Sequence, residues 1–177
     1  SGMSSDARLV TPAVTAAALG PPRTRRVAAE RGETAAVDAL LAAGAPVDAT
    51  SPTGLTALHK ASHLGHTSIV SSLLANGAGV GVREATNGST ALILAAASGH
   101  APVAALLLAS RASPSEADSE GRTPLIYTSR RGHSEALEAL LHAVVDDGVD
   151  AADETGLTPL MAAAHAGEIE SVRQLLE

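Results

Sequence analysis

Three histidines lie close together in the segment HKASHLGH, residues 59–66. His59, His63 and His66 are separated by four and three residues, the spacings at which side chains share one face of a helix. Imidazole is a common ligand of Zn²⁺, which needs three or four convergent groups. The segment therefore raises three alternatives: a zinc site, a catalytic cluster, or histidines that the fold requires.

The composition favours a protein made of short, closely packed helices. The 177 residues include no Phe, no Trp and one Tyr, although 45% of the chain is apolar. A core without large rings must bring its elements close together through small residues. Because β-branched and aromatic residues, which strands favour, are scarce, we expect stacked helices and not a sheet.

Charge and cysteine content exclude several classes of function. The net charge of −7 argues against non-specific binding to nucleic acid or to an anionic membrane, since both need a positive field. The chain has no cysteine, which excludes disulfides and cysteine-based zinc sites. No apolar run approaches the roughly 18 residues that span a bilayer. We therefore expect no nucleic-acid partner and no direct membrane insertion.

The first 22 residues differ in character from the remainder. Ser1-Gly2-Met3 has the form of a vector scar before a native start, and an Ala- and Pro-rich stretch follows it. Residues 10–20 match a signal peptide only weakly, because Asp6 lies ahead of the apolar stretch. We expect residues 1–22 to be a disordered leader, and the protein to be cytoplasmic, with the nucleus as an alternative location.

The remainder of the chain repeats. Four segments align: GLTALHKASHLGH (54–66), GSTALILAAASGH (88–100), GRTPLIYTSRRGH (121–133) and GLTPLMAAAHAGE (156–168). Each contains a threonine that is followed nine residues later by a glycine and then by a pair of leucines. The threonines are spaced 34, 33 and 35 residues apart: Thr56, Thr90, Thr123 and Thr158. A degenerate fifth copy, with Gly32 and Leu40-Leu41, precedes them.

Each copy predicts two short helices followed by a polar turn. The threonine is a good helix N-cap, and Pro124 and Pro159 follow it at the first helical position, where a missing N–H costs nothing. The glycine can end this helix in a left-handed conformation. A second helix then carries apolar residues at helical spacing, as in Val70, Leu73 and Leu74. Helices this short are stable only when neighbouring copies stack.

This pattern resembles the ankyrin repeat, whose motif is a turn, the sequence T-P-L-H and two antiparallel helices in about 33 residues. The resemblance covers residues 23–177, in copies at about 23–50, 51–84, 85–117, 118–152 and 153–177. It implies an all-α solenoid of five stacked helix-turn-helix repeats joined by short β-hairpin loops. It also implies that the hairpin tips and the first helices line a concave binding face.

The copies depart from the motif at their junctions. Arg111 replaces the glycine that ends the second helix of the third copy, and residues 144–147 lengthen the fourth. We expect these two junctions to differ from the others. Residues 23–26 (RTRR) stand in place of the signature in the first copy and suggest a polar cap, whereas no cap follows the final SVRQLLE. We therefore expect a fragment whose parent protein continues.

The alignment separates the three histidines. His59 occupies a position that holds Ile93, Ile126 and Met161 in the other copies, so we predict that this position points into the interior. The resemblance implies that such a histidine bonds the backbone of a neighbouring turn. His66 aligns with a histidine in two other copies and serves the start of the second helix. His63 alone, on the exposed face of the first helix, remains free for function, and we predict no metal site.

No catalytic constellation emerges elsewhere. The chain has no G-x-S-x-G nucleophile elbow. The glycine-rich residues 77–81 follow a predicted helix and are too short for a dinucleotide fingerprint. We therefore predict no enzyme activity and no cofactor.

The positions that the motif leaves free on the turns and first helices are the predicted partner-binding residues. They are Leu55, His63, Leu64, Asn87, Glu120, Arg122, Arg130, Arg131, Glu154, Leu157 and His165. Three arginines belong to the fourth copy, and two readings remain open. In the first, the arginines form a solvated surface paired with Glu120 and Glu154. In the second, they bind an acidic or phosphorylated segment of a partner, because guanidinium groups match carboxylate and phosphate.

The resemblance and the free surface together predict a non-catalytic protein–protein interaction module. It would be monomeric in isolation and would bind a partner protein or peptide on its concave face. The alternative is a regulatory or targeting segment of a larger enzyme or membrane protein.

Overall fold

The computed structural model of the protein describes residues 23–144 and 146–177. The predicted leader, residues 1–22, and part of the predicted insertion at residues 144–147 lie outside the described residues. For Arg23 and Arg25, two of the arginines in the predicted polar cap, only the backbone is described.

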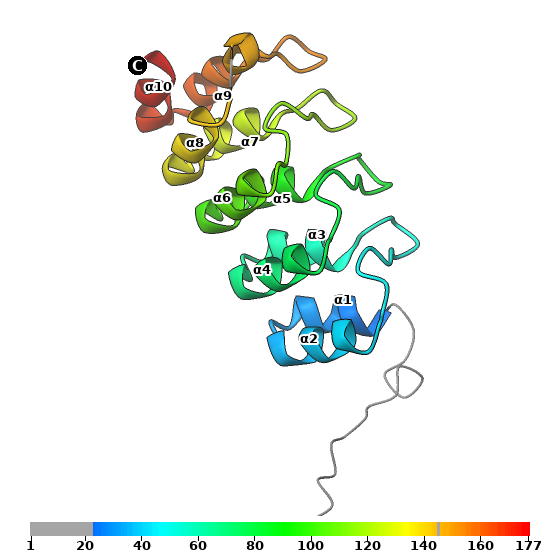
Figure 1. The fold of residues 1–177 in the computed structure, drawn as a ribbon. Coiled ribbons are helices and arrows are strands. Elements are labelled where there is room, and N and C mark those ends of the chain that lie inside the picture. The colour runs from blue at the N-terminus through cyan, green and yellow to red at the C-terminus, as the bar shows by residue number, and fades with distance from the viewer. Residues whose placement is uncertain (1–22, 145) are drawn as a thin grey trace, which may run out of the picture.

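The described chain forms ten α-helices and one short 3₁₀ helix, η1, and contains no strand. The helices are α1 (Arg23–Glu30), α2 (Thr34–Ala42), α3 (Ala57–His63), α4 (Thr67–Ala75), α5 (Ala91–Ala97), α6 (Ala101–Ala109), α7 (Pro124–Arg131), α8 (Ser134–Leu141), η1 (Asp146–Asp150), α9 (Pro159–Ala166) and α10 (Ile169–Leu176). Consecutive α-helices form five pairs, which stack in a row from α1–α2 to α9–α10 (Figure 1). The predicted all-α solenoid is confirmed.

The predicted signals begin and end the first helices. Each threonine hydroxyl accepts a hydrogen bond from the amide three residues later, at 3.3 Å for Thr56 and 3.4 Å for Thr123. Pro124 and Pro159 occupy the start of α7 and α9. The glycines that follow these helices have φ angles between 66° and 77°: Gly65, Gly99, Gly132 and Gly167. Side-chain capping and left-handed glycine therefore set the helix length, as the sequence predicts.

The core runs along the stack and is built from small and aliphatic side chains. Leucines at equivalent positions of three neighbouring pairs are buried: Leu58, Leu92, Leu125, Leu73, Leu107 and Leu140. Alanines such as Ala61 and Ala95 are also fully buried and let the helices approach closely. One interior prediction is wrong: Met161 is 56% exposed, whereas the aligned Ile126 is 1% exposed. In the α7–α8 pair the following helix α9 packs against this side, whereas the described residues contain no helix pair after α9–α10.

The turns between pairs are hairpin-like but too short to form strands. Each is closed by one backbone hydrogen bond across its base: Ser51 N to Leu55 O (2.9 Å), Glu84 N to Ser89 O (3.0 Å), Asp118 N to Arg122 O (3.1 Å) and Asp153 N to Leu157 O (3.1 Å). Neighbouring tips are joined by Ala85 N to Thr53 O (2.9 Å), Ser119 N to Asn87 O (2.7 Å) and Glu154 N to Glu120 O (3.1 Å). These bonds link the turns into one continuous row along an edge of the stack (Figure 1).

The junction at Arg111 does not differ from its glycine counterparts, contrary to our expectation. Arg111 has a φ of 68°, against 80° for Gly77, and its amide donates to Leu108 O (2.9 Å) as Gly77 N donates to Leu74 O (3.0 Å). The packing of α6 therefore imposes the left-handed conformation on an arginine. The other expected departure is present, because η1 follows α8 and no other junction of the described chain contains such a helix.

Replacing Arg111 with glycine is expected to stabilise the protein by about 1 kcal/mol. An L side chain in the left-handed region costs about 1–2 kcal/mol, and the greater chain entropy that glycine loses on folding offsets part of this gain. Urea unfolding measures the change. The matched control is Gly77→Arg, which we expect to destabilise by a similar amount, because a Cβ at Gly77 meets no atom within 4 Å. Arg111→Gly unfolding at an unchanged or lower urea concentration would contradict the strain at Arg111.

Candidate functional site

The row of turns and the adjacent first helices form a surface that contains two pockets. One, of about 240 Å³, lies between α3 and α5 and is called the α3–α5 pocket. Its lining residues are Leu55, His59, Lys60, His63, Glu84, Thr86, Asn87 and Leu94. The other, of about 400 Å³, lies between α7 and α9 and is called the α7–α9 pocket. Its lining residues are Arg130, Leu157, Ala162, His165 and Ala166.

The α3–α5 pocket is lined mainly by apolar surface, and its charged side chains are already engaged. Lys60 Nζ lies 3.0 Å from Glu30 Oε1, and the exposed His63 pairs through Nδ1 with Ser98 Oγ at 3.0 Å. Glu84 accepts hydrogen bonds from the amides of Thr86 (2.8 Å) and Asn87 (2.6 Å). Burial opposes ionisation of Glu84, but these hydrogen bonds outweigh it and lower its pKa below the ordinary 4.5. The pocket therefore offers apolar surface and no free cation.

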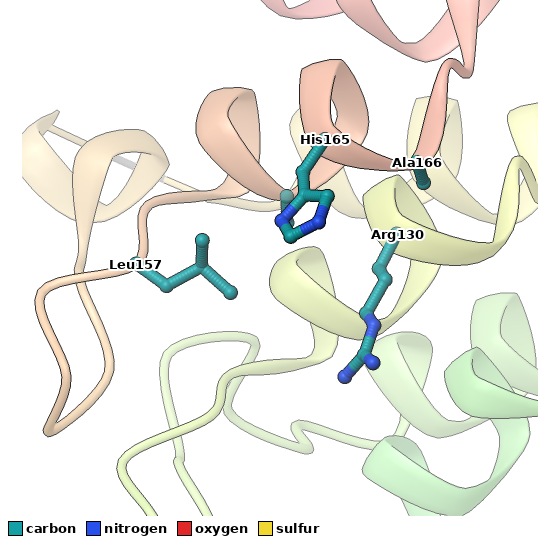
Figure 2. Close-up of a pocket in the computed structure, with 5 residues that line it drawn as sticks. Arg130, Leu157, His165 and Ala166 are labelled. Atoms are coloured by element: carbon teal, nitrogen blue, oxygen red, sulfur yellow. The ribbon is translucent and has the colours of Figure 1, made fainter.

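The α7–α9 pocket is lined by one free cation and by mainly apolar surface. Figure 2 shows the His165 ring of α9 between Leu157, which comes from the preceding turn, and Arg130, which comes from α7. Among the described residues, no carboxylate or carbonyl pairs with the Arg130 guanidinium. The lining contains no acidic side chain. This pocket can therefore take an apolar group together with a negative charge.

The three arginines of the fourth copy have different environments. Arg122 forms an ion pair with Glu120 and lies 3.8 Å from Asp153 Oδ2. Arg131 donates to Ala97 O and lies over the ring of Tyr127, 5.9 Å from its centroid. The paired reading thus holds for Arg122, with Asp153 in the place of Glu154. Arg130 is the arginine of the three that is left for an external anion.

The comparison with protein families agrees with this architecture. A family model described as ankyrin repeats (3 copies) matches residues 26–118 and 106–177, which is most of the chain. The chain belongs to the ankyrin-repeat family. Members of this family generally act as protein–protein interaction modules and are typically non-catalytic. No curated protein sequence matches the chain. In the part of the chain that the structure describes, no helix is both long and apolar enough to cross a membrane.

The predicted partner-binding residues fall into two groups on the ankyrin surface. Six of them line the two pockets: Leu55, His63, Asn87, Arg130, Leu157 and His165. The other five lie outside both pockets: Leu64, Glu120, Arg122, Arg131 and Glu154. Leu64, which follows α3, is 41% exposed and adds apolar surface outside the pockets.

The predicted partner-binding residues leave out several residues of the α3–α5 pocket, among them Lys60 and Leu94. Both stand four residues after the capping threonine, at the position that Tyr127 occupies in the fourth copy. In the structure Lys60 and Leu94 are half-buried but line the pocket from its two sides. The sequence did indicate that this position belongs to the site, because Lys60 lies three residues before His63 and so shares its helix face.

The three histidines of residues 59–66 do not converge. His59 is 1% exposed, with Nε2 3.0 Å from Val82 O and Nδ1 2.8 Å from Thr56 Oγ1. His66, at the start of α4, points to the preceding pair, where its Nε2 lies 3.4 Å from Glu30 O. The predicted interior position of His59 and its bond to a neighbouring turn are therefore confirmed. Within the described residues, no three His, Asp or Glu side chains are grouped so that they could hold a metal ion.

His59 is expected to make the stability of the protein pH-dependent. Burial lowers its pKa from the ordinary 6.5, so the unfolded chain takes up a proton at a pH where the folded chain does not. Stability from this residue is complete above pH 6.5 and falls as the pH drops below it. We expect His59→Ile, which copies the aligned Ile93, to flatten the curve of unfolding free energy between about pH 5 and 6.5.

Urea unfolding of both proteins over this range measures the effect. The interval above about pH 7.5 is an internal control, because there the two stability curves should run parallel. If the free energy of unfolding of His59→Ile still changes with pH between about pH 5 and 6.5 as it does in the wild type, another group is responsible.

Proposed function

We propose that the chain is a non-catalytic interaction module that binds a partner protein or peptide on the concave face formed by the turns and first helices. The observation that carries this proposal is the unpaired Arg130 guanidinium in a mainly apolar pocket. Leu157 and His165, which line the same pocket, occupy positions that the fold leaves free to vary. An apolar pocket with a few convergent polar groups is the usual form of a binding site.

We further propose that the partner presents an acidic or phosphorylated group to Arg130. A guanidinium forms charge-assisted hydrogen bonds with carboxylate and phosphate oxygens, and these are stronger than bonds between neutral groups. The whole chain carries a net charge of −7, so an anionic partner needs a local positive site to approach it. Arg130 supplies that site, with Arg131 beside it in sequence on α7.

Hydrogen exchange of the partner complex tests where the partner binds. A partner captured from the source cell with the full chain is mixed with that chain, and amide protection is mapped along it. We expect protection in the turns and in the first helices α3, α5, α7 and α9, and unchanged exchange in the second helices α4, α6 and α8. Protection confined to the second helices would place the interface on the opposite face and overturn the proposal.

We also propose, as an alternative, that the chain is a regulatory or targeting segment of a larger enzyme or membrane protein. Met161, Ile169 and Leu176 are exposed at the α9–α10 end of the stack, at 56%, 76% and 69%. Apolar surface of this kind favours a packed neighbour at that end, such as another domain of an enzyme or membrane protein that the repeats regulate.

A further inference from the structure

The surface of turns and first helices that contains both pockets is called the groove. We propose that it binds one extended peptide that inserts an apolar side chain into each pocket, the two anchors being about six positions apart in the peptide. We also propose that a carboxylate adjoins the anchor in the α7–α9 pocket. This inference rests on the proposed function and names the partner's chemistry more closely.

Each pocket is lined by a leucine and a histidine that occupy equivalent positions in their own copies. Leu55 and His63 contribute to the α3–α5 pocket, and Leu157 and His165 contribute to the α7–α9 pocket. In each pair the leucine precedes the capping threonine and the histidine follows it by seven residues. The copies between them carry Ser89 and Arg122 at the leucine position, so among the four copies with a capping threonine the second and the fifth carry this leucine.

The size of the pockets suits amino-acid side chains. Their volumes are about 240 Å³, below the range for drug-sized ligands, and about 400 Å³, near the lower end of that range. Each is lined mainly by apolar surface. A single aliphatic or aromatic side chain can therefore fill the smaller pocket, and the larger has room for a neighbouring group.

The stacking of the helices sets the distance between the anchors. The first helices α3, α5, α7 and α9 contact one another in sequence, and each pocket lies between two of them. The pockets are therefore two helix spacings apart, which is about 16–20 Å at about 8–10 Å per helix. An extended chain advances about 3.3 Å per residue, so about five to six residues span this distance, and a separation of six places both side chains on the same face of the extended chain.

The charges of the two pockets determine which anchor the acidic residue of the peptide adjoins. Arg130 is unpaired in the α7–α9 pocket, whereas Lys60 in the α3–α5 pocket is bound to Glu30. Glu84 adds a carboxylate to the wall of the α3–α5 pocket, which disfavours an acidic residue there. A peptide with one acidic residue is therefore expected to place it beside Arg130.

Synthetic peptides test the spacing. Fluorescein-labelled peptides of about fifteen residues in a serine and threonine background carry two leucines separated by about two to nine residues. One glutamate adjoins either the first or the second leucine, and binding to the full chain is read by fluorescence anisotropy up to about 1 mM. We expect the affinity to peak at a separation of about six and to be about tenfold higher than that of a peptide with one leucine.

Two variants test the contacts at the two pockets, and a third is their control. Arg130→Glu should remove the preference for glutamate over glutamine, a loss of about tenfold or more. Leu94→Lys, which copies the aligned Lys60, changes the lining of the α3–α5 pocket. It should remove the gain in affinity that a peptide with two leucines has over a peptide with one. Arg111→Glu is the charge-matched control, because Arg111 is exposed on the loop after α6, away from both pockets, and should bind the series as the wild type does.

An affinity that does not depend on the leucine separation, or no binding of any peptide at about 1 mM, would overturn the two-anchor inference. The proposed function fails separately, on hydrogen exchange that maps the partner to the second helices. A flat spacing series with protection in the groove would refute the two anchors alone.

Discussion

Gly65→Ala is expected to lower the free energy of unfolding by about 2–4 kcal/mol. Gly65 has a φ of +74°, which an L side chain rarely adopts. A Cβ at this position would also lie 2.6 Å from His100 Nδ1, well inside van der Waals contact. The His100 ring cannot move away freely, because its Nε2 lies 3.0 Å from His63 O. The backbone strain and the steric clash therefore both lower the free energy of unfolding of Gly65→Ala.

Gly167→Ala separates these two contributions. Gly167 has nearly the same φ, +77°, but a Cβ there meets no atom within 4 Å. We expect this control to lose only the conformational cost of about 1–2 kcal/mol. Urea unfolding at pH 7.5 compares the two variants. Equal losses would show that the contact between the glycine and the histidine of the next pair contributes nothing.

Asp118→Ala is expected to cost about 2–3 kcal/mol. This carboxylate is buried at the base of the turn before α7 and accepts bonds from the amides of Glu120 and Arg122, both at 3.0 Å. Its second oxygen accepts from the Tyr127 hydroxyl at 2.7 Å. Hydrogen bonds to a charged acceptor are worth more than neutral ones, and three are lost together.

Tyr127→Phe is the control for the Asp118 prediction. It removes the bond to Oδ2 and leaves both turn amides paired, so we expect a loss of about 1 kcal/mol. Thermal unfolding of the two variants and of the double variant measures each share. If Asp118→Ala loses no more than Tyr127→Phe, the turn does not depend on its carboxylate, and the account of how Glu120 and Arg122 are positioned is wrong.

The fold could be predicted because its signals are local. Thr56 and Thr123 cap their own helices, and Gly65 ends one by its own conformation, so each residue carries the information that it needs. Arg111 was misjudged because an intrinsic preference was taken as decisive, whereas the packing of the helix imposes the left-handed turn. Met161 was misjudged because its burial depends on a following helix pair.

The candidate site could be predicted only in part, because its electrostatics depend on contacts between repeats. The sequence places Arg122, Arg130 and Arg131 in one copy, but it does not show that Asp153, from the next turn, lies near Arg122. Nor does it show that Ala97 O, from the preceding pair, accepts from Arg131. Once these contacts are known, Arg130 stands out as the unpaired cation of the three.

The affinity of the captured partner for Arg130→Glu, measured by titration calorimetry beside the wild type and Arg111→Glu, tests the central claim most directly. Both variants change the net charge by the same amount, so only position distinguishes them. We expect Arg130→Glu to weaken binding by about tenfold or more and Arg111→Glu to leave it unchanged. Equal affinities for all three proteins, or equal losses in both variants, would contradict binding of the partner at Arg130 in the groove.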